Sequence, residues 1–172
     1  APLSHLALVL VGEGKAYFDG HLYPGAEALK LAGLSPVVLK AKEGLALVNG
    51  TQAMGALGVV TLNEAERIGV AADMAASLTM EALQGIICAF DSDLLAVRPH
   101  PEIQKVGARM RHFLKGSKRI TKQGELRMQD AYSLRCIPQV HAASWQSFHH
   151  ADNVVHVEVN ATTDNPVVLE RG

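Results

Sequence analysis

Cysteine, aromatic residues and net charge are all scarce in this sequence. Only two of its 172 residues are cysteines, Cys88 and Cys136, and they form no C-x-x-C pair. With no signal peptide in sight, this favours a reducing, cytoplasmic compartment. Aromatic residues make up 5% of the chain and the formal net charge is −1. The longest basic cluster, 115–122, is short and reads as a solvated loop, so we expect no nucleic-acid partner.

Long hydrophobic runs are missing as well. The most apolar stretch, Leu6–Val11, is far too short to span a bilayer, and later apolar runs are interrupted by polar residues at 63–67. We therefore expect no membrane partner. The chain is still 48% apolar and 19% charged, which is enough to bury a core. We expect residues 1–172 to form a single globular piece.

The spacing of apolar residues and turn signals predicts a mainly α fold. Helical patterns cover 2–12, nearly all of 51–87, 101–116 and 138–159, with glycines or prolines at their ends. Asp19-Gly20 is the strongest hairpin signal. The predicted architecture is a bundle of long antiparallel helices with a small β-hairpin near the N-terminus. The 51–87 helix is apolar around most of its circumference, which predicts a place inside a bundle or an oligomer.

Three candidate sites have ordinary structural explanations. Gly12-Glu13-Gly14 lacks the third glycine and the preceding strand of a dinucleotide fingerprint, so it is interpreted as a helix stop. His141 and His149 lie two turns apart, whereas metal ligands on one helix are normally one turn apart, so we expect an exposed or interface face and no metal. Asp91 and Asp93 are interpreted as helix-capping or turn residues.

A polar interruption in "KEGLALVNGTQ" has two interpretations. Asn49-Gly50 can simply form a turn that links two helices. However, the polar side chains of Asn49, Thr51 and Gln52 lie between two apolar runs and need hydrogen-bond partners. The spacing alone leaves a structural and a functional role open.

The stretch "RMQDAYSLRCIPQV" places Gln129, Tyr132 and Arg135 three residues apart. On a helix they would share one side. An amide, a phenol and a guanidinium together can bind an amino-acid headgroup, with the guanidinium holding the carboxylate through two parallel hydrogen bonds. A capped, polar helix start before Pro138 explains the same residues equally well.

Several segments together resemble the aromatic amino acid lyase family. They are "APLSH", "VGEGKAYFDGHLYPGAEAL", "KEGLALVNGTQ", "RPHP", "MQDAYSLRCIPQVHAASWQ" and "EVNATTDNPVV", in the order and spacing of that family and across essentially the whole chain. "NGTQ" and "QDAYSLR" are the most specific. Gln52 and the "SLRC" continuation favour the histidine-specific branch, the histidine ammonia-lyases, over the enzymes that act on phenylalanine or tyrosine.

The resemblance implies elimination of ammonia from L-histidine to give trans-urocanate. The family uses no metal or nucleotide and makes its own electrophile, methylidene-imidazolone, from an internal Ala-Ser-Gly. That tripeptide lies a few residues upstream of the family's "APLSH", and this chain starts at Ala1. We therefore expect a central fragment that begins after the tripeptide, ends after the last long helix, and is inactive alone.

The resemblance also assigns roles to individual residues. Asn49 matches the asparagine whose amide supports the methylidene-imidazolone. Gln129 and Tyr132 match residues that line the same pocket, and Tyr132 is also expected to act in catalysis. Arg135 matches the arginine that holds the substrate carboxylate. Asn160 matches part of a family motif, shared with 164–166, whose expected role is architectural.

Two alternatives to the histidine-specific branch remain open at this point. A phenylalanine or tyrosine ammonia-lyase, or a related aminomutase, would share these residues, because the loop that recognises the ring lies outside the chain. A non-catalytic helical assembly module would share the apolar helices. The resemblance further implies a homo-oligomer, expected to be a tetramer when intact.

Overall fold

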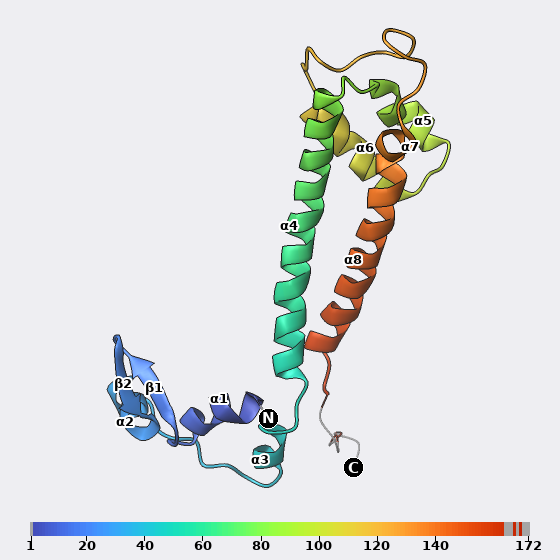
Figure 1. Cartoon of the computed structure of the whole chain (residues 1–172). Helices are drawn as coiled ribbons and strands as arrows, with labels where there is room; N and C mark the ends of the chain where they lie inside the picture. Colours follow the sequence, from blue (N-terminus) through green and yellow to red (C-terminus); the bar gives the residue numbers. More distant parts are fainter. Residues whose placement is uncertain (1, 164–166, 168, 170–172) are drawn as a thin grey trace. The chain divides into compact units, whose positions relative to one another are not determined.

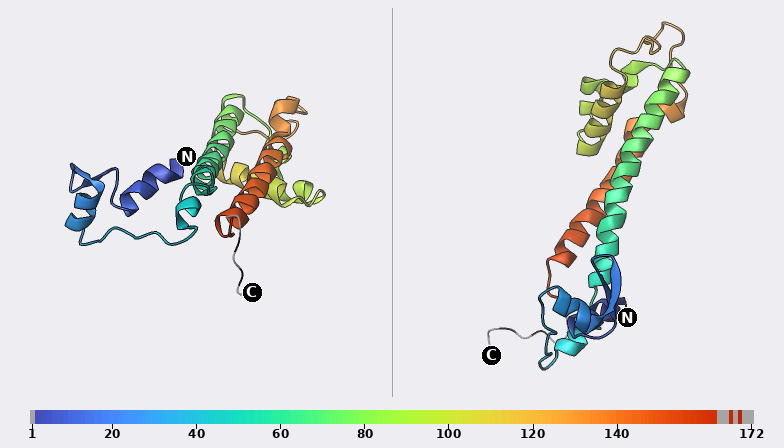
Figure 2. Two further views of the ribbon diagram at one scale, coloured as in Figure 1. Left: turned by 90° about the horizontal axis from the view of Figure 1, so that it is seen from below. Right: turned by 90° about the vertical axis from the view of Figure 1, so that its left-hand side faces the viewer.

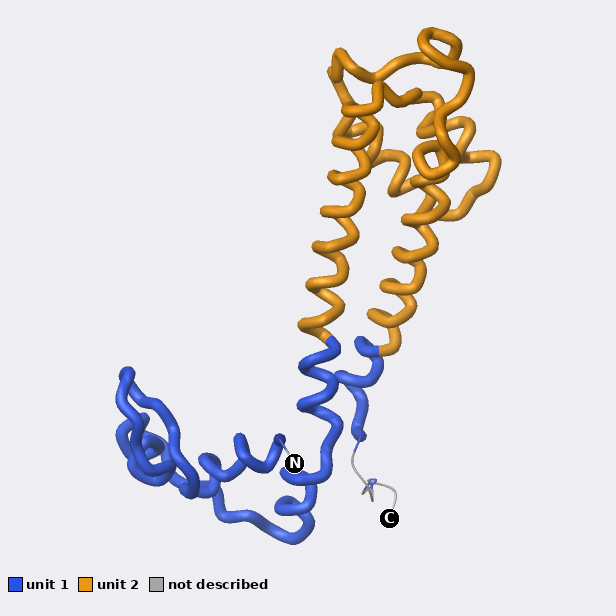
Figure 3. The backbone as a smooth tube through the Cα atoms, in the orientation of Figure 1, with its two compact units in different colours: residues 1–58, 155–172 blue, residues 59–154 orange. Residues whose placement is uncertain are grey.

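The computed structural model describes residues 2–163, 167 and 169. By contact density the chain divides into one unit of residues 1–58 and 155–172 and a second unit of residues 59–154 (Figure 3). Each unit is described by itself. The elements are mainly helical, as predicted, with a small antiparallel hairpin near the N-terminus (Figure 1).

The first unit begins with short elements whose turns follow from glycine positions. In chain order they are α1 (Pro2–Leu10), β1 (Lys15–Phe18), β2 (His21–Pro24), α2 (Gly25–Leu31) and α3 (Glu43–Ala46). Gly12, with φ 85°, follows α1 and acts as the predicted helix stop. Asp19 and Gly20 both have positive φ, 47° and 76°. Type I′ hairpin turns require this, so the predicted hairpin is confirmed.

Two long helices, α4 (Gln52–Ala82) and α8 (Ile137–Val159), run side by side in opposite directions (Figures 1 and 2). Glycines on α4 allow close contact within each unit. In the first unit a Cβ at Gly58 would meet Val155, and in the second a Cβ at Gly69 would meet Trp145. The predicted pair of long antiparallel helices is therefore confirmed.

Helix α4 ends before position 87, the end expected from the apolar pattern. Gln84 adopts φ 50°, and a Cβ at Gly85 would clash with Met80 Cε. The chain therefore turns sharply where only glycine fits. Two arginines satisfy carbonyl groups at this end: Arg119 Nε donates to Glu81 O at 2.9 Å, and Arg127 Nη2 donates to Leu83 O at 2.8 Å.

The second unit packs shorter helices against the ends of α4 and α8. They are the 3₁₀ helix η1 (Ile87–Phe90), α5 (Ser92–Ala96), α6 (Pro101–Phe113) and α7 (Tyr132–Arg135). Asp91 caps α5, because its Oδ1 accepts hydrogen bonds from the backbone N–H groups of Asp93 and Leu94. The capping role is thus confirmed for Asp91. The most deeply buried apolar side chains of this core are Met80, Phe90, Val106 and Met110.

A buried charge cluster joins α4, α6 and α8 in the second unit. The carboxylate of Asp73 is fully buried, and its oxygens lie 2.6 Å from Arg109 Nε and 2.6 Å from His141 Nδ1. The Arg109 guanidinium carbon lies 4.5 Å from the ring centroid of Trp145. Because the carboxylate of α4 contacts side chains from both α6 and α8, it fixes how these three helices pack.

Two histidines of α8, His141 and His149, have structural partners. His141 contacts Asp73, and His149 Nδ1 lies 3.2 Å from Glu102 Oε1. Both side chains therefore face carboxylates of neighbouring helices, where the sequence suggested an exposed or interface face. Among the described residues no group of histidine, cysteine, aspartate or glutamate side chains could hold a metal ion. Within the same residues, no helix is both long enough and apolar enough to cross a bilayer.

Candidate functional site

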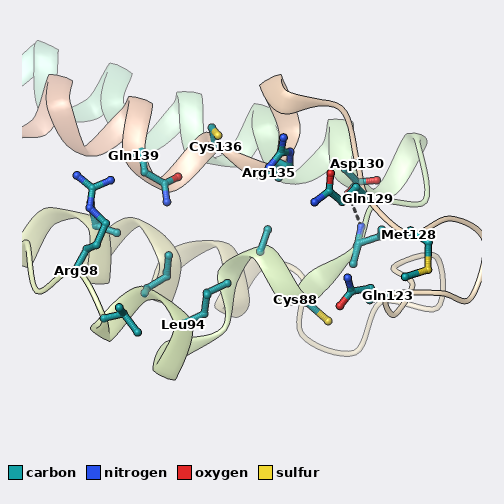
Figure 4. Close-up of a pocket in the computed structure, with 15 residues that line it drawn as sticks. Cys88, Leu94, Arg98, Gln123, Met128, Gln129, Asp130, Arg135, Cys136 and Gln139 are labelled. Carbon is teal, nitrogen blue, oxygen red and sulfur yellow. Dashed lines mark hydrogen bonds between the residues drawn. The ribbon is translucent and has the colours of Figure 1, made fainter.

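A pocket of about 420 Å³ opens in the second unit. One wall comes from η1, α5 and the start of α6; the other comes from the loop before α7, from α7 and from the first turn of α8 (Figure 4). Its lining combines aliphatic side chains with polar and sulfur-containing ones. The side chains that could bind or react with a ligand are Arg98, Gln123, Gln129, Arg135 and Gln139, together with the free thiols of Cys88 and Cys136.

Asp130 holds the loop against the end of α4. The residue is 7% exposed. Its Oδ2 accepts a hydrogen bond from the backbone N–H of Ile86 at 2.6 Å, and its Oδ1 accepts one from Arg127 Nε at 2.7 Å. A carboxylate with both oxygens engaged in this way is a fixed anchor. It determines where the neighbouring Gln129 lies.

Gln129 lines the pocket, but not through helical periodicity. Helix α7 begins only at Tyr132, and Ala131 before it is extended, with φ −54° and ψ 148°. The idea that Gln129, Tyr132 and Arg135 share one helix face is therefore wrong. The physical reason is Asp130, whose bond to Ile86 keeps the backbone before α7 out of the helix.

Tyr132 lies beside the pocket and does not line it. The residue is 70% exposed, and its hydroxyl has no hydrogen bond to any described residue. The guanidinium carbon of Arg135 lies 5.0 Å from its ring centroid. This cation–π contact restricts the orientation of the guanidinium.

Arg135 reaches the pocket with an unused donor. Its Nε is buried and has no hydrogen-bond partner among the described residues. Buried donors in proteins are nearly always paired. A free guanidinium N–H at a pocket wall is suited to a carboxylate that comes from outside this part of the chain.

Asn49 belongs to the first unit and is not among the residues that line the pocket. It is exposed, just after α3, and its backbone N–H donates to Leu45 O at 2.9 Å. Its side-chain amide makes no hydrogen bond to any described residue. Within the second unit the structure thus places Gln129 and Arg135 at the same pocket and Tyr132 next to Arg135.

The family motif near the end of α8 is only partly described. Asn160 Nδ2 donates to His156 O at 2.7 Å, which satisfies a carbonyl at the end of the helix and fits an architectural role. Residues 164–166, the rest of that motif, lie outside the described residues.

Sequence reasoning missed Gln139. It lines the pocket, and its Oε1 is buried without a partner among the described residues. A signal for it exists, because Gln139 follows Arg135 by four residues, about one helical turn. The proline at position 138 instead favoured interpreting this stretch as the start of a helix.

A family model described as aromatic amino acid lyase matches residues 1–172. The chain belongs to the aromatic amino acid lyase family. Relatives named histidine ammonia-lyase include proteins from Geobacillus sp. (strain WCH70), 54% identical over 172 residues, and Bacillus subtilis (strain 168), 53% identical over the same length. Each match covers 100% of this chain but only 34% of the relative. The chain therefore spans about a third of the length of these relatives.

Solved structures of lyase-family members share the fold. A tyrosine aminomutase from Streptomyces globisporus superposes with a TM-score of 0.87 at 33% identity, covering 100% of this chain and 36% of its own. A histidine ammonia-lyase from Trypanosoma cruzi superposes with a TM-score of 0.80 at 39% identity, covering 99% of this chain and 32% of its own. The mainly helical fold of this lyase segment is therefore that of the family.

Proposed function

We propose that this chain is part of an ammonia-lyase that converts L-histidine to trans-urocanate and ammonia. The observation that carries the proposal is the identity of 54% to a histidine ammonia-lyase over the whole chain. The pocket supports it, because an arginine with an unused buried N–H and an amide side chain line it together. These groups are suited to an amino-acid headgroup.

In this proposal Arg135 binds the substrate carboxylate. The planar guanidinium presents N–H donors in a fixed geometry, and its stacking on Tyr132 limits rotation. A carboxylate held at two points orients the adjacent carbons for removal of a proton. Positioning of this kind can lower a barrier by several kcal/mol. Gln129 contributes an amide to the same pocket, and the exposed hydroxyl of Tyr132 is free to bond substrate.

The family's methylidene-imidazolone has to be formed by residues outside this 172-residue chain, because its sequence contains no Ala-Ser-Gly. When bound, this group supplies the electrophile that makes the amino group a better leaving group. Asn49 fits a supporting role, because its amide is exposed and unengaged by any described residue. An amide N–H directed at a carbonyl stabilises developing negative charge there.

An aminomutase or a lyase for phenylalanine or tyrosine is the second candidate. The TM-score is higher for the tyrosine aminomutase, 0.87, than for the histidine ammonia-lyase from Trypanosoma cruzi, 0.80. Identity ranks the two in the opposite order, 33% against 39%. We give identity more weight, because backbone superposition reports a shared fold whereas substrate choice depends on side chains.

The cellular setting and assembly of the intact enzyme form part of the same proposal. We propose a cytoplasmic homotetramer with L-histidine as substrate, without a metal, nucleotide, nucleic acid or membrane. Large apolar side chains that α4 leaves exposed support assembly; they include Met54, Leu57, Ile68 and Leu78. A non-catalytic assembly module would need the same helices, but it would not need an arginine with an unused N–H at a pocket wall.

The test is formation of urocanate by the intact lyase that contains this segment, followed by absorbance with L-histidine as substrate. We expect steady turnover by the intact protein. The isolated 172-residue chain should show none above a boiled control, because it has no Ala-Ser-Gly from which to form the electrophile. Turnover by the isolated chain would refute the role of that group, and absence of turnover by the folded intact protein would refute the proposed function.

A further inference from the structure

Two buried polar atoms at the pocket are left without partners among the described residues, and their chemistry is opposite. Arg135 Nε is a donor, and Gln139 Oε1 is an acceptor. Burying either atom without a hydrogen-bond partner destabilises the protein. A single ligand that satisfies both must carry an acceptor as well as a donor.

The backbone places these two side chains on successive turns. Cys136 lies between α7 and α8, its N–H donates to Tyr132 O at 3.0 Å, and its carbonyl accepts from Gln139 N at 3.1 Å. The chain therefore keeps coiling from Arg135 to Gln139, and both residues contribute to the same wall of the pocket (Figure 4). Residues four apart on such a coil are neighbours.

The described residues that line the pocket offer no free carboxylate to act as the acceptor instead. Asp130 is the acidic residue among them, and both of its oxygens are bonded to Ile86 and Arg127. Within this lining, Gln139 Oε1 is thus a buried, unengaged acceptor close in sequence to the arginine. It is neutral.

We propose that Gln139 contacts the substrate: its side-chain carbonyl accepts a hydrogen bond from the α-amino group while Arg135 binds the α-carboxylate. This inference rests on the proposed function and adds a residue to it. An α-amino acid carries one donor group and one acceptor group on the same carbon, which matches the donor and the acceptor that the pocket leaves unpaired. A neutral amide suits this position better than a carboxylate, because a negative charge would hold the amine in its protonated, unreactive form.

The experiment compares substrate with an analogue that lacks only the amine, in the intact enzyme. Gln139→Met removes the acceptor and keeps the length and flexibility of the side chain. We expect the KM for L-histidine to rise at least about tenfold, the loss typical of a hydrogen bond to a charged group. The inhibition constant of imidazole-4-propionate, which keeps the ring and the carboxylate, should stay within about twofold.

Two further variants complete the design. Gln139→Glu keeps an acceptor and adds charge, so we expect KM near the parent value but a kcat at least about tenfold lower at neutral pH, recovering as pH rises. Gln104→Met is the matched control: Gln104 Nε2 is also buried without a partner among the described residues, but Gln104 does not line the pocket. It should leave both constants unchanged.

The outcomes separate this inference from the proposed function. If the parent enzyme produces urocanate and Gln139→Met leaves KM within twofold, the role of Gln139 is wrong and the proposed function stands. A parallel rise of KM and of the analogue's inhibition constant also overturns it, because that pattern reports a change in pocket shape. A folded parent enzyme without turnover on L-histidine refutes the proposed function and the inference together.

Discussion

Arg135 combines two features that a lysine cannot reproduce. Its guanidinium carbon lies 5.0 Å from the ring centroid of Tyr132, and its buried Nε has no partner among the described residues. Stacking fixes the plane of the guanidinium, and the free N–H sets the direction from which a carboxylate can bind. An ammonium group is a point charge without either directional property.

Arg135→Lys in the intact enzyme should therefore lower kcat/KM for L-histidine at least about tenfold, or about 1.4 kcal/mol of transition-state stabilisation. Steady-state kinetics measures this. The matched control is Arg67→Lys, because the Arg67 side chain is 72% exposed and pairs with the exposed Glu64. Near-parental kinetics in a folded Arg135→Lys enzyme would mean that this arginine does not hold the carboxylate.

Tyr132→Phe removes one hydroxyl and keeps the ring that stacks on Arg135. Because the residue is 70% exposed, we expect the unfolding midpoint to stay unchanged while kcat falls at least about tenfold, a typical loss for a group that takes part in proton transfer. Tyr17→Phe, on the hairpin and 76% exposed, is the control and should not change kcat. An unaltered kcat in the Tyr132 variant would remove the hydroxyl from the mechanism.

Local spacing predicted part of this site, and long-range contacts decided the rest. "QDAYSLR" indicated Gln129 and Arg135, which do line the pocket. It could not show that Asp130 binds Ile86, 44 residues away in sequence, and so keeps Gln129 outside the helix. The spacing of Gln139, four residues after Arg135, was a usable signal, but its burial at the pocket depends on η1 and α5 on the opposite wall.

At the scale of elements, the packing of α4 against α8 depends on a missing side chain. A Cβ at Gly69 would lie 2.7 Å from Trp145 Cζ2. Trp145 is 6% exposed, lies under the Arg109 guanidinium and meets the Phe148 ring edge to face, so it has little room to move. Glycine in a helix interior is otherwise unfavourable, which indicates that its small size is what the position requires.

Gly69→Ala should consequently lower stability, even though alanine favours helix. The gain in propensity is about 1 kcal/mol, and overpacking costs about 1–3 kcal/mol. Gly58→Ala on the same helix is the control, because its nearest contact, Val155 Cγ2 at 3.6 Å, is ordinary, and it should raise stability by about 0.5–1 kcal/mol. Unfolding midpoints from circular dichroism compare the two, and equal shifts would show that Trp145 does not confine Gly69.

Asp73→Asn tests the charge cluster that joins α4, α6 and α8. Loss of the charge leaves Arg109 without its ionic partner, which typically costs about 3–5 kcal/mol for a buried pair. We expect the lower end, because the Arg109 side chain is 26% exposed. Asp152→Asn, exposed on α8, should be neutral by the same thermal measurement. A change below about 1 kcal/mol at position 73 would show that the cluster does not stabilise the helix packing.

The sequence predicted the long helices from their apolar periodicity, but it misplaced a helix end that depends on the conformation of a few residues. Helix α8 was predicted as 138–159 and spans Ile137–Val159, because its helical apolar pattern runs over this whole length. Helix α4 was predicted to reach 87 and ends at Ala82. The apolar pattern continues past that point, but Gln84 and Gly85 take conformations that close packing against Met80 imposes.

At the scale of the whole molecule, many large apolar side chains remain exposed on the single chain. Helix α4 buries Asp73, Ser77 and Met80, while large apolar side chains on it such as Met54 and Leu57 are about 70% exposed, at 70% and 68%. A long helix with this pattern is expected in contact with other protein. This chain also spans about a third of its curated relatives, at 34% of their length.

We therefore expect the isolated 172-residue chain to associate at micromolar concentration. Exposed apolar helix faces gain free energy when they are buried against one another. Light scattering measures the mass, and replacing Met54 and Leu57 with glutamate should shift it toward the monomer. A parent chain that stays monomeric would show that these faces do not drive assembly.

The central claim is that the intact lyase acts on L-histidine, and substrate discrimination tests it most directly. The measurement is kcat/KM of the intact enzyme for L-histidine, L-phenylalanine and L-tyrosine, followed through the corresponding unsaturated acids, with any β-amino acid product assayed in parallel. We predict that kcat/KM for L-histidine exceeds that for either other amino acid by at least about a hundredfold. A site built to hydrogen-bond a polar ring disfavours rings that cannot form those hydrogen bonds. Equal or higher kcat/KM for phenylalanine or tyrosine, or a β-amino acid as the main product, would contradict the account.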